Sequence, residues 1–204
     1  MDQVGSRTGA PTAVRDGDAV GPPPIPAPVD PWEFRPLGPQ DGYVSLVWEW
    51  MNRPHVAAAW DQAWPQERWE AEIARQAAGD HSRPCIALLD GRPVAYLEVY
   101  RVLRDRLAPL YPFRPHDLGV HIAIGHPDDI GRGLGRSLLR TVADGLLAAD
   151  EACTRVVAEP DVTNTASLRA FATAGFRRVG EVTMPHKTAA LLVRPRTEED
   201  LPRW

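Results

Sequence analysis

Two spacings of hydrophobic residues divide the chain into helices and strands. Apolar residues at intervals of three and four positions predict helices, because this spacing places them on one helix face. Alternating or short uninterrupted apolar runs between turn-forming residues predict strands. The predicted helices span 42–51, 66–78, the residues that follow Gly135, and 164–174, with a helical turn and loop over 55–64. The predicted strands span 32–37, 84–89, 93–102, 117–124, 155–159, 176–183 and 188–193.

The order of these elements predicts the fold class. Helices lie between strands around one sheet, which indicates an α/β (α+β) domain. Asp90-Gly91, between two of the strands, is the strongest short hairpin signal in the chain. A chain of 204 residues is long enough for one domain with a proper core.

The first residues differ from the rest in composition. Residues 1–31 are rich in Gly, Pro, Ala and Asp and end in GPPPIPAPVDP. So few large apolar residues cannot bury enough surface to offset the entropy lost on ordering. We therefore expect residues 1–31 to be a disordered tail, with its proline run in extended polyproline II, and residues 32–204 to form the domain.

Charge and composition exclude several classes of function. A net charge of −4 and a pI of about 5.9 argue against a nucleic-acid partner, since no basic face is implied. Cys85 and Cys153 form neither a disulfide framework nor part of a metal-ligand cluster, so we expect buried thiols and no metal. No apolar run approaches the ~18–20 residues of a membrane span, and no signal peptide is recognisable. These observations predict a cytoplasmic protein.

The stretch from Asp117 to Arg140 carries the first candidate chemistry. Its strand alternates apolar residues on one face with small residues and His121 on the other. The turn GRGLGR over residues 131–136 then opens a helix, where unpaired N–H groups and the helix dipole favour an anion such as a pyrophosphate. A plain strand-to-helix turn explains these glycines equally well. A dinucleotide-binding turn is rejected, because the full G-x-G-x-x-G spacing and the acidic ribose ligand are missing.

A second motif favours the anion-binding interpretation of this turn over a plain strand-to-helix turn. In residues 159–176, EPDVTNTASLRAFATAGF, Asn164 is followed by Ala166, Phe171 and Gly175-Phe176. Together with the R-G-x-G-R turn, this pattern resembles the GNAT acyltransferase superfamily over residues 32–195. The resemblance implies a single domain with a mixed central sheet flanked by helices, and acyl-CoA (acetyl-CoA or succinyl-CoA) as co-substrate. It also implies CoA contacts from Ile122, Ile124, Gly131, Arg132, Gly133, Gly135, Arg136 and Asn164.

Three further segments resemble the siderophore-biosynthesis branch of this superfamily. They are WEWMNRPHVAAAWDQAWP (48–65), LEVYRVLRDRLAPLYPFRPHDLGVHIAI (97–124) and MPHKTAAL (184–191). Enzymes of this branch move an acyl group from CoA to the terminal nitrogen, usually hydroxylated, of lysine, ornithine or a related diamine such as cadaverine. The resemblance thus implies an N-acyltransferase that makes a siderophore hydroxamate from a small amine or hydroxylamine.

Two alternatives to this function stay open. One is an aminoglycoside 6′-N-acetyltransferase or another small-amine acetyltransferase, since these near cousins share the tryptophan- and asparagine-rich start. The other is a non-catalytic acyl-CoA-binding module. The sequence also leaves the oligomeric state open, a homodimer included.

His121 and Glu159 are the candidate catalytic residues. An ordinary amine with a pKa of ~10.4 is protonated at neutral pH, so a base must help it to attack a thioester. His121 has a reference pKa near neutrality and matches the histidine of the mycobactin-type pattern. Glu159 stands where that pattern has an acidic residue, and it can orient His121 or act as a base through water. A hydroxylamine arrives neutral, so positioning matters more for it than deprotonation.

Two positions depart from the wider superfamily. Phe171 stands where many GNAT enzymes carry a tyrosine that protonates the departing thiolate, a tyrosine that the mycobactin-type branch also lacks. Ile130 stands where the turn often begins with Gln or Arg, but the backbone amides of the turn remain. We therefore expect CoA binding to persist, and the thiolate proton to come from water or another group.

The acceptor is expected in a cleft between residues 48–65 and 101–116. An alkyl chain needs aromatic walls, a distal ammonium needs a carboxylate, and a carboxylate needs a cation. Trp60 and Tyr111 are the candidates for the aromatic walls, and Glu98 and Asp117 are the candidates for the carboxylate. Lys187, beside His186, is the candidate for the cation. Structural alternatives exist, since tryptophans at such spacing are typical of a core and a lysine beside a turn is typical of a solvated surface.

Overall fold

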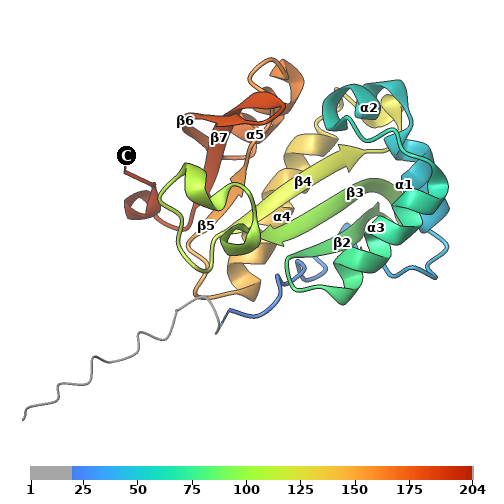
Figure 1. Cartoon of the computed structure of the whole chain (residues 1–204), viewed down its shortest axis with the longest axis horizontal. Coiled ribbons are helices and arrows are strands. Elements are labelled where there is room, and N and C mark those ends of the chain that lie inside the picture. The colour runs from blue at the N-terminus through green and yellow to red at the C-terminus, as the bar shows by residue number, and fades with distance from the viewer. Residues whose placement is uncertain (1–19, 204) are drawn as a thin grey trace, which may run out of the picture.

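A seven-stranded sheet with helices on both faces forms the domain (Figure 1). The computed structural model describes residues 20–203. The strands are β1 (Trp32–Pro36), β2 (Ser82–Leu89), β3 (Arg92–Arg101), β4 (Leu118–Ile124), β5 (Arg155–Ala158), β6 (Arg177–Met184) and β7 (Lys187–Pro195). The helices are α1 (Val44–Met51), α2 (Pro54–Trp60), α3 (Gln66–Ala78), α4 (Leu134–Ala149) and α5 (Thr165–Thr173). The predicted α/β class and the mixed sheet are confirmed, and the element ends differ only slightly from those predicted.

The strand order is β1-β2-β3-β4-β5-β7-β6. All neighbours are antiparallel except β4 and β5, which are parallel and are joined through α4. The predicted hairpin between β2 and β3 is confirmed. Asp90 and Gly91 both have a positive φ, as the tight turns that match the twist of two strands require.

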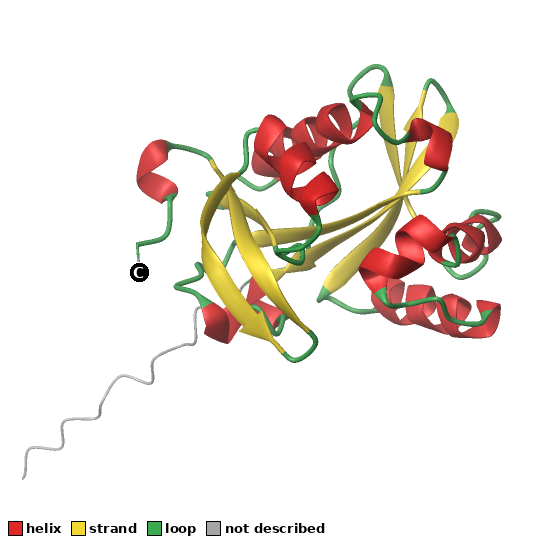
Figure 2. Cartoon of the chain, turned by 90° about the horizontal axis from the view of Figure 1, so that it is seen from above, coloured by secondary structure: helices red, strands yellow, loops and turns green. Residues whose placement is uncertain are grey.

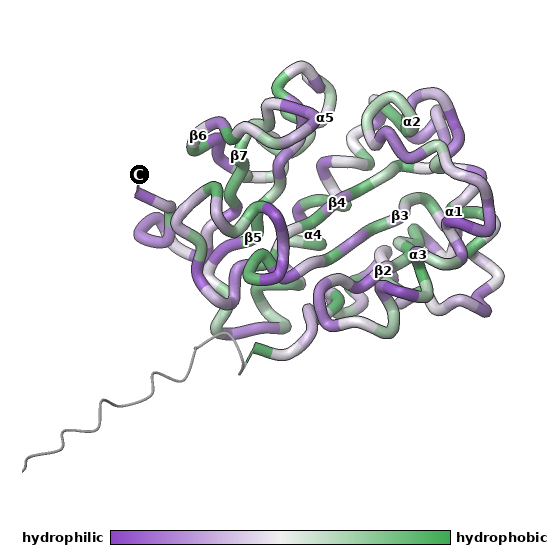
Figure 3. The backbone as a smooth tube through the Cα atoms, in the orientation of Figure 1, coloured by the Kyte–Doolittle hydropathy of each residue, from purple (hydrophilic) through white to green (hydrophobic). Residues whose placement is uncertain are grey.

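The helices cover the two faces of the sheet separately, as Figure 2 shows from above. On one face, the apolar side of α4 packs with Phe171 of α5 on residues of the central strands such as Leu118 and Val120. On the other face, α1 and α3 bury Met51, Trp69 and Ile73 against β2 and β3. In Figure 3 the segment between β3 and β4 shows both hydrophobic and hydrophilic stretches. Its apolar residues, Leu107 among them, form a third cluster with β6 and β7.

β4 and β5 part soon after they meet. β5 pairs with β4 only at Leu118 and Gly119, whereas β3 pairs with β4 along its whole length, from Leu118 to Ile124. Within the described part of the chain, the second half of β4 therefore has no strand beside it on the β5 side. Backbone polar groups left without a strand partner need another one. This parting is where the fold positions its site.

Residues 20–31 differ from the expectation of a disordered tail, while residues 1–19 lie outside the described residues. Val20 is buried, and the buried Arg101 donates hydrogen bonds to the carbonyls of Gly21 and Pro22. Pro26 lies against Gly145 of α4, where an added Cβ would come within 2.8 Å of it. Composition misses this because a few apolar contacts, such as that of Val20, are supplemented by hydrogen bonds from the domain's side chains to backbone carbonyls, which any residue supplies.

Three other observations concern expectations drawn from composition. Cys85 and Cys153 are free thiols, and both are buried, as predicted. Among residues 20–203 no group of three or more His, Cys, Asp or Glu side chains is arranged to hold a metal ion. No helix in that range is both long and apolar enough to cross a bilayer.

Candidate active site

His121 of β4 is held between two carboxylates from neighbouring strands. Its Nδ1 lies 3.0 Å from Oε2 of Glu98 on β3, and its Nε2 lies 2.7 Å from Oε1 of Glu159, which follows β5. Glu98 is directly opposite His121 in the antiparallel register. The side chain of His121 is 31% exposed while that of Glu159 is only 5% exposed, so the ring can be reached from solvent and its partner is sheltered. The structure thus brings together the two predicted catalytic residues.

Further hydrogen bonds fix both carboxylates. The Tyr100 hydroxyl donates to Glu159 Oε2 at 2.7 Å. Glu98 Oε1 accepts from Gln76 of α3 at 2.7 Å and from the Tyr96 hydroxyl at 3.0 Å. A carboxylate with both oxygens engaged has little freedom to move. Glu98 therefore holds the imidazole, and it is not free to receive the ammonium of an acceptor as the sequence suggested.

The electrostatics of this arrangement favour a charged histidine. Burial lowers the pKa of His121, but the charge of Glu159 and the hydrogen bonds to Glu159 and Glu98 outweigh it and raise the pKa to about 10. Burial raises the pKa of Glu159, but the charge and hydrogen bond of His121 outweigh it and lower the pKa to about 2. At neutral pH the resting site is therefore an imidazolium between two carboxylates.

Gly119 is required by the close approach of Tyr100. A Cβ at Gly119 would lie 1.9 Å from the Tyr100 ring, so only glycine fits beneath it. The ring also lies beside His121, with the ring centroids 4.8 Å apart. Gly119, on the same face of β4 as His121, thus allows Tyr100 to reach Glu159.

Trp60 of α2 forms another wall of the site. Its ring meets that of His121 edge-on at 5.8 Å between centroids, in agreement with a place in the acceptor cleft. Its Nε1 donates to the Ile122 carbonyl at 3.3 Å, and His55 Nε2 lies 3.0 Å from the Ile124 carbonyl. These carbonyls belong to the half of β4 that β5 does not pair. The backbone of Ile122 and Ile124, predicted to contact CoA, is therefore at the parting of the strands.

The glycine turn has a backbone conformation that requires glycine at two positions. Gly131 and Gly133 have φ values of 77° and 80°, a region that residues with a Cβ rarely adopt. Gly133 precedes the first residue of α4, and the first helical hydrogen bond runs from the Ser137 N–H to the Gly133 carbonyl. Gly135 lies where the helix start meets β4, since an added Cβ would be 3.4 Å from Ile124.

The two arginines of this turn, Arg132 and Arg136, form no ion pair within residues 20–203. Behind the hydrogen bond from Arg92, the charge of Arg132 helps to lower the pKa of nearby Asp129. A hollow adjoins the turn and is lined by Trp32, Leu89, Arg92, Asp129, Arg132, Gly133, Leu134 and Ser137. Helix N–H groups at the start of α4, two arginines and a hollow form a suitable place for an anionic, elongated ligand.

Asn164 and Phe171 have structural roles in α5. The Asn164 side chain caps the helix by accepting from the Ser167 N–H at 3.0 Å. This engages the amide oxygen and leaves the side-chain amide N–H groups to donate, so the CoA contact of Asn164 stays a prediction. Phe171 is buried against Phe176, with ring centroids 4.9 Å apart. The ring in this position carries no hydroxyl, as the sequence indicated.

Tyr111 and Asp117, both expected in the acceptor cleft, belong instead to a buried framework. The Tyr111 hydroxyl donates to Asp117 Oδ2 at 2.7 Å, and Arg155 Nε donates to Asp117 Oδ1 at 2.9 Å. Asp117 is 0% exposed and the side chain of Arg155 is 2% exposed. Because the carboxylate is enclosed and fully bonded, it is not placed to bind a substrate ammonium.

Among the residues predicted to bind the acceptor, Lys187 is the one that supplies a positive charge at the site. Its Nζ donates to the backbone carbonyl of Glu159 at 2.6 Å and lies 3.9 Å from Glu159 Oε1. It is also the only lysine in the sequence. Its side chain is 29% exposed, which leaves room for a ligand at its outer side.

The residues that hold the two carboxylates were not predicted from the sequence. Tyr96, Glu98 and Tyr100 are alternate residues of β3, so their side chains share the face that meets His121. The period-2 pattern could have identified both tyrosines as companions of Glu98. Gln76 gave no such signal, because its partner Glu98 lies on a different element.

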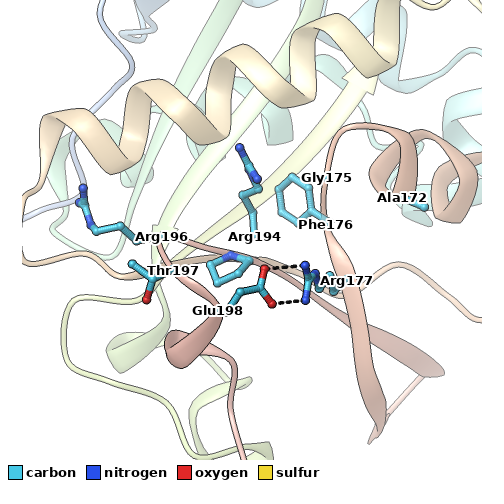
Figure 4. A pocket seen from close by; sticks show the side chains of 9 residues that line it. Ala172, Gly175, Phe176, Arg177, Arg194, Arg196, Thr197 and Glu198 are labelled. Atoms are coloured by element: carbon cyan, nitrogen blue, oxygen red, sulfur yellow. Dashed lines mark hydrogen bonds and ion pairs between the residues drawn. The ribbon is translucent and has the colours of Figure 1, made fainter.

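A second hollow lies apart from this centre (Figure 4). It is lined by Ala172, Gly175, Phe176, Arg177, Arg194, Pro195, Arg196, Thr197 and Glu198. Its arginines have partners: Arg177 pairs with Glu198, Arg194 pairs with Asp144, and Arg196 donates to backbone carbonyls. With its cations already neutralised or engaged, this hollow offers no comparable chemistry.

A parallel strand pair parts beside a glycine turn, with a histidine and carboxylates at the parting, and the family match and the relatives support the class of acyl-CoA-dependent N-acyltransferases. Residues 41–184 match the acetyltransferase (GNAT) domain family, and the chain belongs to this family. The resemblance suggested by the two sequence motifs is thereby confirmed.

Known relatives agree with the suggested branch. The chain is 39% identical over 184 residues to lysine N-acyltransferase MbtK of Mycobacterium sp. (strain MCS), covering 90% of this chain and 75% of the relative. It is 33% identical over 147 residues to N(6)-hydroxylysine O-acetyltransferase of Escherichia coli, covering 72% of this chain and 47% of that relative. A solved structure of AAC(6′)-Ib with ribostamycin and coenzyme A superposes with a TM-score of 0.70 at 27% identity, covering 82% of this chain and 94% of that one.

Proposed function

We propose that this protein transfers an acyl group from acyl-CoA to the terminal, N-hydroxylated nitrogen of lysine, ornithine or cadaverine, and so makes a siderophore hydroxamate. The relatives named for lysine and hydroxylysine acylation are more similar to this chain than the aminoglycoside enzyme is. The reaction would take place in the cytoplasm with a small-molecule acceptor and without a metal.

The observation that carries this proposal is the pair of carboxylates that contact both ring nitrogens of His121 and raise its pKa. A histidine with a pKa of about 10 is already protonated at neutral pH and has no lone pair with which to deprotonate an ammonium. Glu159, with its pKa lowered to about 2, is a weak base as well. A site of this kind suits a nucleophile that arrives neutral, and a hydroxylamine does so where an ordinary amine with a pKa of ~10.4 does not.

His121 then works as an acid. Acyl-CoA supplies the thioester carbonyl that the acceptor nitrogen attacks, with loss of the CoA thiol. His121 gives a proton to the departing sulfur, and the proton released by the nitrogen returns to the His121–Glu159 pair. One N–C bond forms, one C–S bond breaks, and the pair ends in its starting state. This assignment supplies the acid that Phe171 cannot provide, and it replaces the role of base expected for His121.

The acyl donor would lie along the free half of β4 with its diphosphate at the glycine turn. Support comes from the half of β4 that has no strand beside it on the β5 side, from the backbone of Gly131 and Gly133, and from Arg132 and Arg136, which form no ion pair within residues 20–203. These groups recognise the CoA portion and not the acyl group. Acetyl-CoA and succinyl-CoA are therefore both donors to be tested.

The test measures CoA thiol release with three acceptors in parallel: N6-hydroxylysine, its unhydroxylated parent lysine, and kanamycin. Turnover with the hydroxylamine alone is expected. His121→Ala should lower kcat by about 10²–10⁴-fold, the usual range for losing a general acid or base, with the KM for acyl-CoA nearly unchanged.

Other outcomes of this assay reject the proposal. Turnover with kanamycin alone would assign the protein to the aminoglycoside acetyltransferases. CoA binding without thiol release from any acceptor, including N-hydroxycadaverine and N-hydroxyornithine, would indicate a non-catalytic binding module.

A further inference from the structure

A guanidinium without an acidic partner lies at the acceptor side of the site. Arg106 is exposed in the segment between β3 and β4, and it has no acidic partner within residues 20–203. Its Nη1 lies 2.9 Å from Nε2 of His186, the residue in the turn between β6 and β7. Since arginine can only donate, His186 is the acceptor of this bond. The remaining N–H groups of Arg106 are left for another ligand.

Arg106 is linked to the reacting groups through the turn between β6 and β7 and through the apolar cluster of its neighbour Leu107. His186 directly precedes Lys187, whose Nζ contacts the Glu159 carbonyl. Leu107, which follows Arg106, packs in one cluster with Met184 of the same hairpin and with Tyr100, which donates to Glu159. We call Arg106, His186 and Lys187 the basic rim. Lys187 borders Glu159 directly, and the contact between Arg106 and His186 continues the rim away from it. Figure 1 shows the segment before β4 next to β5 and β7.

The surroundings of Arg106 contrast with those of the other arginines nearby. Arg104 pairs with Asp80, and Arg114 pairs with Asp200, although all three belong to the same segment. Both of these pairs hold the segment to the rest of the domain. Arg106 instead adds a positive charge without an ion-pair partner within residues 20–203 beside His186, which favours an anion and opposes a second cation.

We propose that the basic rim binds the α-carboxylate of the acceptor, which makes the acceptor an amino acid of the lysine or ornithine type and not a decarboxylated diamine. The inference rests on the proposed function and narrows its substrate class. An acceptor with its nitrogen at His121 would lie between Trp60, whose ring meets that of His121, and Lys187 of this rim, whose Nζ lies 3.9 Å from Glu159 Oε1. Planar guanidinium and carboxylate groups pair through two parallel hydrogen bonds, and such bonds are strong and directional.

The test uses two acceptors that differ only in this group, N6-hydroxylysine and N-hydroxycadaverine. The KM for N6-hydroxylysine is expected to be lower by about tenfold or more, the usual contribution of a charge-assisted hydrogen bond. Arg106→Gln should remove this difference by raising the KM for N6-hydroxylysine alone. Arg106→Lys, which keeps the charge but not the planar group, should restore part of it.

Arg178→Gln is the matched control. Arg178 lies on β6 of the same hairpin, is exposed and pairs with Glu181. The substitution Arg178→Gln removes the same charge from the protein at a distance from the turn between β6 and β7. The preference for N6-hydroxylysine over N-hydroxycadaverine should therefore remain. Equal KM values for both acceptors in the unaltered protein, or an equal effect of Arg178→Gln, would overturn the inference.

Two further measurements separate other sources of failure. With succinyl-CoA in place of acetyl-CoA, an effect of Arg106→Gln on the donor KM alone would show that the rim binds the carboxylate of the acyl group, against this inference.

Equilibrium titration of the CoA-loaded protein with L-lysine and cadaverine, followed by tryptophan fluorescence, needs no turnover. Tighter binding of L-lysine that Arg106→Gln abolishes would support the rim even if hydroxylamines proved not to be substrates. Equal binding of both ligands would reject it.

Discussion

The acyl-donor side and the acceptor side of the candidate active site are formed by different kinds of chemical groups. The donor side is a single stretch of chain, in which β4 runs into a glycine turn and α4, and its groups are mainly backbone amides and carbonyls. The acceptor side gathers side chains from α3, β3, β4, the end of β5 and the β6–β7 hairpin. Backbone recognition depends on local conformation, whereas the acceptor side depends on packing between elements far apart in sequence.

This difference predicts which changes each side tolerates. A substitution at the donor turn should act through the conformation of a few residues and affect the binding of acyl-CoA alone. A substitution in the acceptor network should alter hydrogen bonds on several strands and affect stability, protonation or acceptor choice. The three following experiments compare the sides, and the largest effect comes first.

The strongest expected effect is on the framework beneath the acceptor side. Asp117→Asn removes the charge that faces Arg155, whose side chain is only 2% exposed. An unpaired buried guanidinium should lower the free energy of unfolding by about 3–5 kcal/mol. Urea unfolding measures this loss, and the KM for acyl-CoA of the protein that remains folded should not change.

Asp144→Asn is the control for this experiment. Asp144 pairs with Arg194 at the surface, with side chains 51% and 32% exposed. Exposed ion pairs contribute about 1 kcal/mol or less. If both variants lost the same stability, the pair of Asp117 and Arg155 would not be the anchor that its burial indicates.

The second experiment changes the donor turn. Gly133→Ala forces a Cβ onto a residue with φ of 80°, at an energetic cost of about 1–2 kcal/mol. If the turn shifts to relieve this strain, the KM for acyl-CoA should rise by about tenfold, because 1.4 kcal/mol corresponds to that factor. The KM for the acceptor should stay the same, as measured by steady-state kinetics with each substrate varied.

Gly42→Ala provides the comparison. Gly42 precedes α1, has no positive φ and has no atom within 4 Å of an added Cβ. It should bind acyl-CoA normally. An acceptor KM that rises with Gly133→Ala as much as the donor KM would contradict the separation of the two sides.

The smallest expected effect is on the pH profile. The raised pKa of His121 means that the imidazolium persists at neutral pH and is lost as the pH rises through about 10. If the imidazolium is the working acid, kcat for a hydroxylamine should fall over the same range. Glu98→Gln removes one of the partners that raise this pKa, so the fall should move to lower pH.

Glu70→Gln, on the exposed side of α3, should leave the profile unchanged. A rate that rises with pH in the unaltered protein would contradict the acid role and favour a histidine that works as a base. A profile that Glu98→Gln does not shift would mean that Glu98 holds His121 without influencing its protonation.

The sequence predicted the donor side better than the acceptor side. The apolar spacing of α4, the alternation in β4 and the glycines at 131 and 133 are local signals, and each was found where expected. His121 and Glu159 were also found together, although only the resemblance to a family connected them beforehand. The polar residues Tyr111 and Asp117 were assigned to substrate and proved to be buried, because a buried polar pair and a binding pair have the same residue types.

By itself, then, the sequence determined the elements, their order and the turn at the start of α4. These follow from spacing and backbone conformation, which are properties of neighbouring residues. Only the tertiary structure decided the charge of His121, the enclosure of Asp117 and the position of Arg106 beside His186. Those properties depend on distances between residues remote in the chain and on burial, because the electrostatic and hydrogen-bond energies of a group are set by what surrounds it after folding.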